Sequence, residues 1–212
     1  MEKYRPIVHD VLIRGFYPNE SVCSGVGVTK EPEAVAQLNL LVDNALLDGV
    51  SLLARRAEND EIVGVAINKI QTKCQPGEKG YFERFISENI TNPTATLLIQ
   101  FMSAADAKVD LFGEMKVERL VECMFLCVLP EASGAGVGRA LVGATEDVAK
   151  QLSISAVSAL FTSSASQAIG KAMGFRVFDV YPHSEFLANG RPIAESLRED
   201  QQFTQICGKV LS

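Results

Sequence analysis

The sequence has few of the residues on which several classes of protein depend. It contains no tryptophan, only two histidines, and five dispersed cysteines that form no CxxC pair. An odd number of separated cysteines argues against a disulfide framework and against a zinc site, and two histidines are too few for a histidine-rich metal centre. We therefore expect no metal cofactor, and a reducing compartment, the cytoplasm, as the simplest location.

Long apolar runs and an excess of positive charge are absent as well. No stretch reaches the roughly 18 uninterrupted apolar residues that a membrane-spanning helix needs, and residues 1–16 carry scattered charges where a signal peptide has an apolar core. The formal net charge of -6 argues against a protein that binds a nucleic-acid backbone. We expect neither a membrane nor a nucleic acid as partner, whereas a cationic substrate is compatible with this charge.

The composition is that of a globular domain. With 212 residues, of which 47% are hydrophobic and 22% charged, the chain can bury a sizeable core. No repeat, low-complexity tract or glycine–serine linker divides it. We predict one domain over residues 1–212, as a monomer or weak dimer.

Hydrophobic periodicity in the first half predicts helices around a hairpin. Apolar residues at helical spacing follow Pro32 and stop at Gly49. Strand-like segments at 50–56 and 61–70 flank a polar turn, which predicts a hairpin. Residues 78–110 contain two helix-like segments, with a break at Asn92-Pro93.

In the second half, strands alternate with helices. Residues 117–130 end in a nearly continuous apolar run, typical of a strand buried on both faces. A glycine-rich loop, a helix, a strand from Ile154 and a short helix ending near Gly174 follow, and two strand-like segments surround the turn Asn189-Gly190. This order predicts a mixed α/β domain with a central mixed sheet flanked by helices.

The loop between the buried strand and its helix carries Gly134, Gly136 and Gly138. Glycine allows the backbone to approach a ligand closely, and the free N–H groups at the start of a helix favour an anion. The position therefore predicts a phosphate site. The alternative is a turn that serves chain geometry alone.

Two familiar nucleotide loops do not fit. A P-loop requires Gly-Lys followed by Ser or Thr, but Gly138 precedes Arg139-Ala140. A dinucleotide fingerprint requires a wider last glycine spacing and an acidic residue after the next strand, which here ends in Phe161-Thr162. The phosphate must belong to another kind of ligand.

The segment Ser133-Gly134-Ala135-Gly136-Val137-Gly138 resembles the acyl-CoA loop, Q/R-x-x-G-x-G/A, of the general-control-type N-acetyltransferase (GNAT) superfamily. The likeness continues in order over residues 117–190, through the helix, the next strand and the helix that closes on Gly174. It departs at Ser133, where the family has Gln or Arg, so a side-chain contact to pyrophosphate is lost. The resemblance implies the GNAT acyl-CoA N-acyltransferase fold and acetyl-CoA as cosubstrate. It implies contacts to acetyl-CoA from Leu126, Cys127, Val128, Ser133, Gly134, Ala135, Gly136, Val137, Gly138 and Arg139, with the backbone of the first three pairing with the pantetheine arm and polarising the thioester carbonyl.

The first half is similar to insect-type arylalkylamine N-acetyltransferases. Residues 15–22, GFYPNESV, resemble that family's F-F-x-D-E-P-L segment, residues 58–70 its hairpin strand, and residues 161–166 its serine-rich segment. Ser21 stands where the family has proline. Few residues precede Glu20, enough for one helix but hardly for the superfamily's usual first strand.

Acetyl transfer to an amine requires a base. An alkylamine with a pKa of about 10.4 is almost wholly protonated at pH 7, and a general base accelerates its reaction by roughly 10²–10⁴. Glu20 matches the family's catalytic glutamate, and the resemblance assigns it this role; without the resemblance, a solvated loop carboxylate is the simpler interpretation. Glu31, before Pro32, suits the first turn of a helix better than catalysis.

The proton donor is less clear from the sequence, because Gly170 occupies the position of the superfamily's tyrosine. Ser166 and Thr162 match hydroxyls that the arylalkylamine family uses near the acyl group, and they also suit capping of the short helix; both roles can hold together. Cys127 as an acyl-accepting nucleophile is disfavoured in an apolar strand, with only His9 and His183 available as partners.

Further candidates for the amine pocket have simpler interpretations. His183 is expected at the surface rather than against substrate. For Met124, Phe125 and Phe101, core packing is favoured over lining an aromatic pocket.

The resemblance predicts an acetyl-CoA-dependent N-acetyltransferase that acts on a small arylalkylamine such as dopamine, serotonin or tryptamine, by direct transfer in a ternary complex. The same chemistry on a polyamine, an agmatine-like amine or a protein amine remains an alternative. So does a CoA-binding module without catalysis, because of Ser133 and the missing tyrosine.

Overall fold

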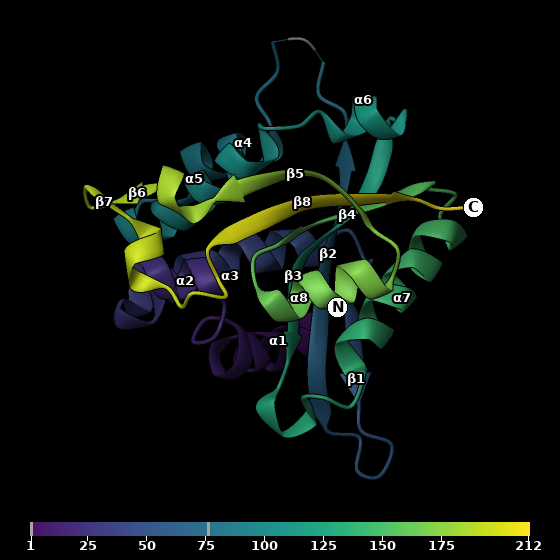
Figure 1. Ribbon diagram of the computed structural model, residues 1–212. Coiled ribbons are helices and arrows are strands. Elements are labelled where there is room, and N and C mark those ends of the chain that lie inside the picture. Colours follow the sequence, from purple (N-terminus) through teal and green to yellow (C-terminus); the bar gives the residue numbers. More distant parts are fainter. Residues whose placement is uncertain (1, 76) are drawn as a thin grey trace.

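The computed structural model describes residues 2–75 and 77–212, and a six-stranded mixed sheet lies at its centre (Figure 1). The strand order is β1-β2-β3-β4-β8-β5, and a separate ribbon pairs β6 with β7. Only β3 and β4 pair in parallel; the other pairs are antiparallel. The strands are β1 (Leu52–Arg55), β2 (Ile62–Thr72), β3 (Arg119–Val128), β4 (Ala156–Phe161), β5 (Arg176–Pro182), β6 (Leu187–Ala188), β7 (Arg191–Pro192) and β8 (Phe203–Val210). The predicted fold class is confirmed.

Helices cover both faces of this sheet. The main core lies between the sheet and the first five helices, and smaller clusters lie under α7. The side chains of Asn92, Asp110 and Ser163 cap α5, α6 and α8 by accepting backbone N–H bonds. The helices are α1 (Arg5–Val11), α2 (Ser21–Val26), α3 (Pro32–Leu46), α4 (Tyr81–Asn89), α5 (Pro93–Asp106), α6 (Leu111–Met115), α7 (Val137–Gln151) and α8 (Ser164–Ala172).

The N-terminal segment is helical throughout. A short 3-10 turn leads into α1, a π-helical turn follows over Leu12–Phe16, and α2 comes next. Within residues 2–51 the structure has no strand, so the sheet begins at β1, as the short N-terminus led us to expect. The predicted helix, hairpin, helix pair and later strands are confirmed; α2, α6 and the ribbon of β6 and β7 were not predicted.

The parallel strands β3 and β4 separate soon after they meet. They pair only at Val121 with Val157 and at Glu122 with Ser158, whereas β4 stays paired with β8 along its length. On its other side β3 has a bulge against β2: Met124 is the extra residue, since Phe125 and Cys123 pair with consecutive residues of β2. A bulge bends and twists the strand that carries it. Among the described residues, no strand pairs with the β4-facing edge of β3 from Cys123 to Val128.

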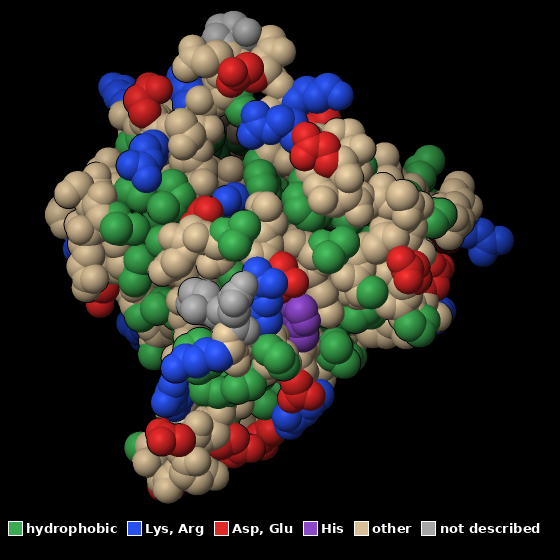
Figure 2. Space-filling model, turned by 180° about the vertical axis from the view of Figure 1, so that it is seen from behind, with side chains coloured by type: hydrophobic (Ala, Val, Ile, Leu, Met, Phe, Trp, Pro, Cys, Tyr) green, Lys and Arg blue, Asp and Glu red, His purple; other side chains and the backbone are tan. Residues whose placement is uncertain are grey.

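The surface mixes charges of both signs. Figure 2 shows Lys and Arg side chains interspersed with Asp and Glu over the rear face, with hydrophobic side chains between them. Ion pairs join some of the charged side chains of the molecule, for example Arg5 with Asp43 and Arg14 with Glu131. Among the described residues, no helix has both the length and the apolarity needed to cross a membrane.

Candidate active site

A cavity of about 930 Å³ occupies the opening between β3 and β4. Every residue of β3 from Glu122 to Val128 lines it, as do the end of β4 and the residues that follow that strand. One end lies against the glycine loop and the start of α7. The other, here called the acceptor end, lies on the face of the sheet that carries α3, α4 and α5, and is lined by Phe16, Leu41, Phe82, Leu98, Met102 and Phe125.

The glycine loop has the geometry of an anion site. Gly134 and Gly136 have φ values of 78° and 80°, in the left-handed region that favours glycine, and open space surrounds both. Gly138 packs so closely on α8 that a Cβ there would lie 3.0 Å from Cδ1 of Ile169. The first N–H groups of α7 have no intrahelical acceptor. All residues predicted to contact the cosubstrate line the cavity except Ala135.

Glu20 is buried, contrary to the simpler interpretation of a solvated loop carboxylate. Its side chain is the N-cap of α2: Oε1 accepts from the Val22 N–H at 3.0 Å, and Oε2 accepts from the Cys23 N–H at 2.7 Å. The Thr162 hydroxyl donates to Oε1 at 2.5 Å. Three hydrogen bonds hold the carboxylate in place at the start of α2, and the residue lines the cavity with 8% of its surface exposed.

Thr162 and Ser166 both line the cavity, but they make different contacts. Thr162 follows β4 and connects that strand to Glu20, so it is not a helix cap. Ser166 completes a capping box with Ser163 at the start of α8. The capping role considered for Ser166 is therefore confirmed, and the structure brings Glu20 and Thr162 together from positions 142 residues apart.

The missing tyrosine has a packing explanation. A Cβ at Gly170 would overlap the ring of Phe161, so no larger residue fits there while that ring keeps its place. Cys127 remains disfavoured as an acyl-accepting nucleophile, because burial raises the pKa of its thiol to about 12 and its Sγ lies 3.5 Å from the Val11 carbonyl oxygen.

The position of His183 was wrongly predicted, whereas that of Phe101 was predicted correctly. His183 is fully buried rather than at the surface: its Nδ1 donates to the Gln201 carbonyl oxygen at 2.8 Å, and its Nε2 accepts from the Thr204 hydroxyl at 2.9 Å. Burial lowers its pKa, although the nearby Glu20 charge opposes that shift. Phe101 packs in the core against the His183 ring, as expected.

Met124 and Phe125 line the cavity, so the favoured core interpretation is incomplete for them. Phe125 also stacks edge-on against Phe16, with ring centroids 5.1 Å apart. Phe16 and Phe82, which sequence reasoning did not single out, contribute further aromatic surface. Phe16 lies four residues before Glu20, within the segment that resembles the arylalkylamine family. That resemblance was the sequence feature that could have identified Phe16 as a site residue.

Glu31 lies away from the cavity, as predicted, but it precedes α3 as its N-cap residue rather than lying in the first turn. Its carboxylate accepts from Asn92 and Thr94. Sequence analysis missed a second buried acid at the cavity, Glu122, which lies within the apolar run of β3. Among the described residues, no group of three or more metal-ligating side chains is placed to hold a metal ion.

No family model and no curated protein matches the sequence. Solved structures do match in fold. Arylalkylamine N-acetyltransferase 2 from Aedes aegypti has a TM-score of 0.86 at 20% identity, covering 100% of this chain and 96% of that one. Drosophila melanogaster polyamine N-acetyltransferase, which forms N-acetylagmatine, has a TM-score of 0.82 at 17% identity over 99% and 96%.

The C-terminal condensation domain of Ebony, in complex with β-alanyl-dopamine, has a TM-score of 0.74 at 12% identity over 100% and 96%. These similarities confirm the predicted likeness at the level of the fold: the chain has the GNAT fold of arylalkylamine and polyamine N-acetyltransferases.

Proposed function

We propose that this protein transfers the acetyl group of acetyl-CoA to the primary amine of a small arylalkylamine, directly and within a ternary complex. One observation carries the proposal: a single cavity joins the glycine loop at the start of α7 to the buried Glu20 carboxylate through the opening between β3 and β4. The fold shared with arylalkylamine N-acetyltransferases supports it.

The residues around the loop fit acetyl-CoA. The α7 N-terminus and the open, left-handed Gly134 and Gly136 suit a pyrophosphate held by backbone N–H groups. The unpaired edge of β3 at Leu126, Cys127 and Val128 offers N–H and C=O groups to an extended amide-bearing arm. Acetyl-CoA supplies the activated thioester. Ser133 contributes no long basic side chain, so we expect the backbone to provide most of the anion contacts.

Glu20 is proposed to receive the amine proton, directly or through a water molecule. The bound ammonium first gives one proton to Glu20, and its neutral nitrogen then forms a bond to the thioester carbonyl carbon. The carbon–sulfur bond breaks, and the second proton of the nitrogen passes to the leaving sulfur, which departs as a thiol. Thr162 holds Oε1 of the base in place, and the Ser166 hydroxyl is assigned to the acyl side of the cavity. The leaving sulfur needs a proton only weakly, since a thiol pKa is about 8.5; a dedicated tyrosine is therefore dispensable.

An aromatic acceptor suits the walls of the acceptor end. Phe16, Phe82 and Phe125 come from three separate elements and add aromatic surface to the cavity that Glu20 also lines. Offset or edge-on contacts between aromatic rings contribute about 0.5–1.5 kcal/mol beyond the area that they bury. The apolar walls, together with one carboxylate that attracts the reacting ammonium, favour an arylalkylamine.

Two measurements test the proposal. Calorimetric titration with acetyl-CoA should give a dissociation constant in the micromolar range, and release of free CoA thiol should follow addition of tryptamine, dopamine or phenylethylamine. Initial rates with both substrates varied should give intersecting reciprocal plots, as direct transfer requires, whereas parallel plots would indicate an acetylated enzyme. Binding of acetyl-CoA without turnover of any amine would instead establish a CoA-binding module, and absence of binding would overturn the assignment altogether.

A further inference from the structure

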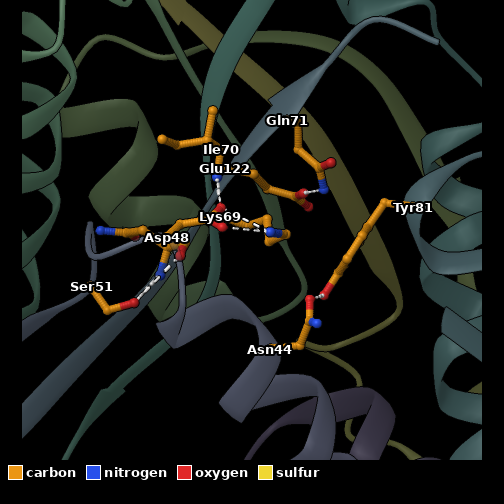
Figure 3. A network of polar contacts seen from close by, with 9 residues as sticks. Asn44, Asp48, Ser51, Lys69, Ile70, Gln71, Tyr81 and Glu122 are labelled. Atoms are coloured by element: carbon orange, nitrogen blue, oxygen red, sulfur yellow. Dashed lines mark hydrogen bonds and ion pairs between the residues drawn. The ribbon is translucent and has the colours of Figure 1, made fainter. Parts of the chain in front are cut away.

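The acceptor end of the cavity contains an acidic residue that the proposed reaction does not use. Glu122 lies on β3 where the pairing with β4 ends, and only 6% of its surface is exposed. Oε2 accepts a hydrogen bond from the Gln71 amide at 2.7 Å (Figure 3). In the part of the chain that the structure describes, no group donates to Oε1, although the side chain lines the cavity.

No positive charge of the described residues pairs with Glu122. Lys69 is its cross-strand neighbour on β2, but the Lys69 ammonium binds both oxygens of Asp48, at 2.8 and 2.9 Å (Figure 3). Asp106, at the end of α5, adds a second acid near Glu122, and burial together with the Glu122 charge raises its pKa. A buried carboxyl group with an unused oxygen is costly unless a donor reaches it.

We propose that Glu122 binds a hydrogen-bond donor at the end of the acceptor remote from the reacting amine, and thereby selects which amines are acetylated. This inference rests on the proposed acetyl transfer. The apolar residues of the acceptor end contact the body of the acceptor, Glu20 faces its reacting nitrogen, and Oε1 of Glu122 accepts from its far group.

The far group of the acceptor must be a hydrogen-bond donor, and it can be neutral or cationic. A phenolic hydroxyl donates one hydrogen bond to Oε1. A second ammonium or a guanidinium donates as well, and its positive charge also favours the ionised form of Glu122, whose pKa burial raises. An amine that ends in bare hydrocarbon leaves Oε1 without a donor and loses this contribution.

Two matched pairs of acceptors test the proposal: tyramine against phenylethylamine, which differ by one hydroxyl, and putrescine against butylamine, which differ by one amine. The ratio of kcat/KM within each pair is measured for the parent, Glu122→Gln and Glu122→Leu. We expect the parent to prefer the donor-bearing member of at least one pair by roughly 10- to 100-fold, the range for a hydrogen bond to a charged group. Because each ratio is taken within one variant, a general loss of activity cancels.

The two variants separate the sources of the donor. Glutamine keeps one acceptor oxygen but no charge. That oxygen can face the substrate when the Gln71 amide, which now donates to Glu122, turns over and accepts from the new amide nitrogen instead. A preference for tyramine should then largely survive Glu122→Gln, while a preference for putrescine should fall at least tenfold. Leucine removes the acceptor and should abolish either preference. Glu146→Gln is the matched control, because Glu146 is a buried acid that binds Lys209 and lies outside the cavity; its ratios should equal those of the parent.

Three outcomes overturn the inference. The first is a parent that acetylates phenylethylamine and butylamine without preferring their donor-bearing partners. The second is a preference that persists in Glu122→Leu. If that variant does not fold, either of two other results overturns the inference: a preference for putrescine that is unchanged in Glu122→Gln, or a preference for tyramine that is lost in the control variant Glu146→Gln. The third is a parent that acetylates none of the four amines, which overturns the proposed function as well and so differs from the other two.

Discussion

Replacing Glu20 with glutamine changes both a catalytic group and a helix cap, and the structure separates the two effects. The carboxylate accepts three hydrogen bonds, from the N–H groups of Val22 and Cys23 and from the Thr162 hydroxyl. Glutamine has one acceptor oxygen. If that oxygen keeps the bonds to Val22 and Thr162, its amide nitrogen faces the Cys23 N–H, and two donors then oppose each other.

The expected magnitudes follow from these contacts. Leaving a buried donor without its acceptor costs about 1–3 kcal/mol, which for a chain of this length lowers the melting temperature by roughly 2–10 °C. Loss of a general base lowers the rate by roughly 10²–10⁴. Structural destabilisation of this size leaves the protein folded at 25 °C, so a rate loss measured there reports on the chemistry.

The assay is kcat/KM for an arylalkylamine at saturating acetyl-CoA, together with the melting temperature and the dissociation constant for acetyl-CoA. Glu20→Gln should lose activity while acetyl-CoA binding stays within about threefold of the parent. Glu31→Gln is the control, because Glu31 also accepts two hydrogen bonds but lies outside the cavity; its activity should be unchanged. A folded Glu20→Gln variant with undiminished turnover would refute the assignment of the base.

Four further predictions follow from packing, burial and backbone geometry. Gly170→Ala should lower the unfolding free energy by about 1–3 kcal/mol, measured by denaturant titration, because its Cβ overlaps the Phe161 ring. Cys127→Ala should retain acetyl transfer within a few fold, since burial raises the pKa of this thiol to about 12 and keeps it protonated. A covalent acetyl adduct that mass spectrometry detects in the parent but not in Cys127→Ala would contradict this. Gly136→Ala should cost about 1–2 kcal/mol in its left-handed conformation and weaken acetyl-CoA binding, seen by calorimetry. Burial lowers the pKa of His183 in the folded protein, so the unfolded chain binds a proton first, and stability should fall as the pH drops below about 6.5; thermal melts that show no such slope, or the same slope in His183→Gln, would count against it.

The order of elements could be predicted because its signals are local. The helix after Pro32, the break at Asn92-Pro93 and the glycine loop before α7 each rest on a few neighbouring residues whose backbone preferences act at short range. The sequence shows that glycine stands at position 170, where the superfamily has a tyrosine, but it does not show the reason. Phe161 fills the space from a different strand, and only packing shows that contact.

The candidate site was predicted in part. Glu20 was correctly placed at the cavity, because the segment around it carried a family likeness, yet its burial was missed. No pattern near residue 20 indicates that Thr162 donates to it. His183 and Glu122 were missed for the same reason: a polar residue is buried when partners from distant segments satisfy it, and those partners are Gln201 and Thr204 for the histidine and Gln71 for the acid.

The amino-acid sequence alone determined most of the elements, their order and the glycine loop, because backbone propensities, caps and hydrophobic periodicity act over a few residues. Only the tertiary structure decided where β3 leaves β4, since that separation depends on a bulge opposite β2 and on the pairing of β4 with β8. The same separation creates the cavity, and it brings a carboxylate from α2, a hydroxyl from the end of β4 and a buried acid of β3 around one space. Contacts between segments far apart in the chain define the site. The free energy of each contact depends on every residue that takes part in it, so no single segment of the sequence predicts it.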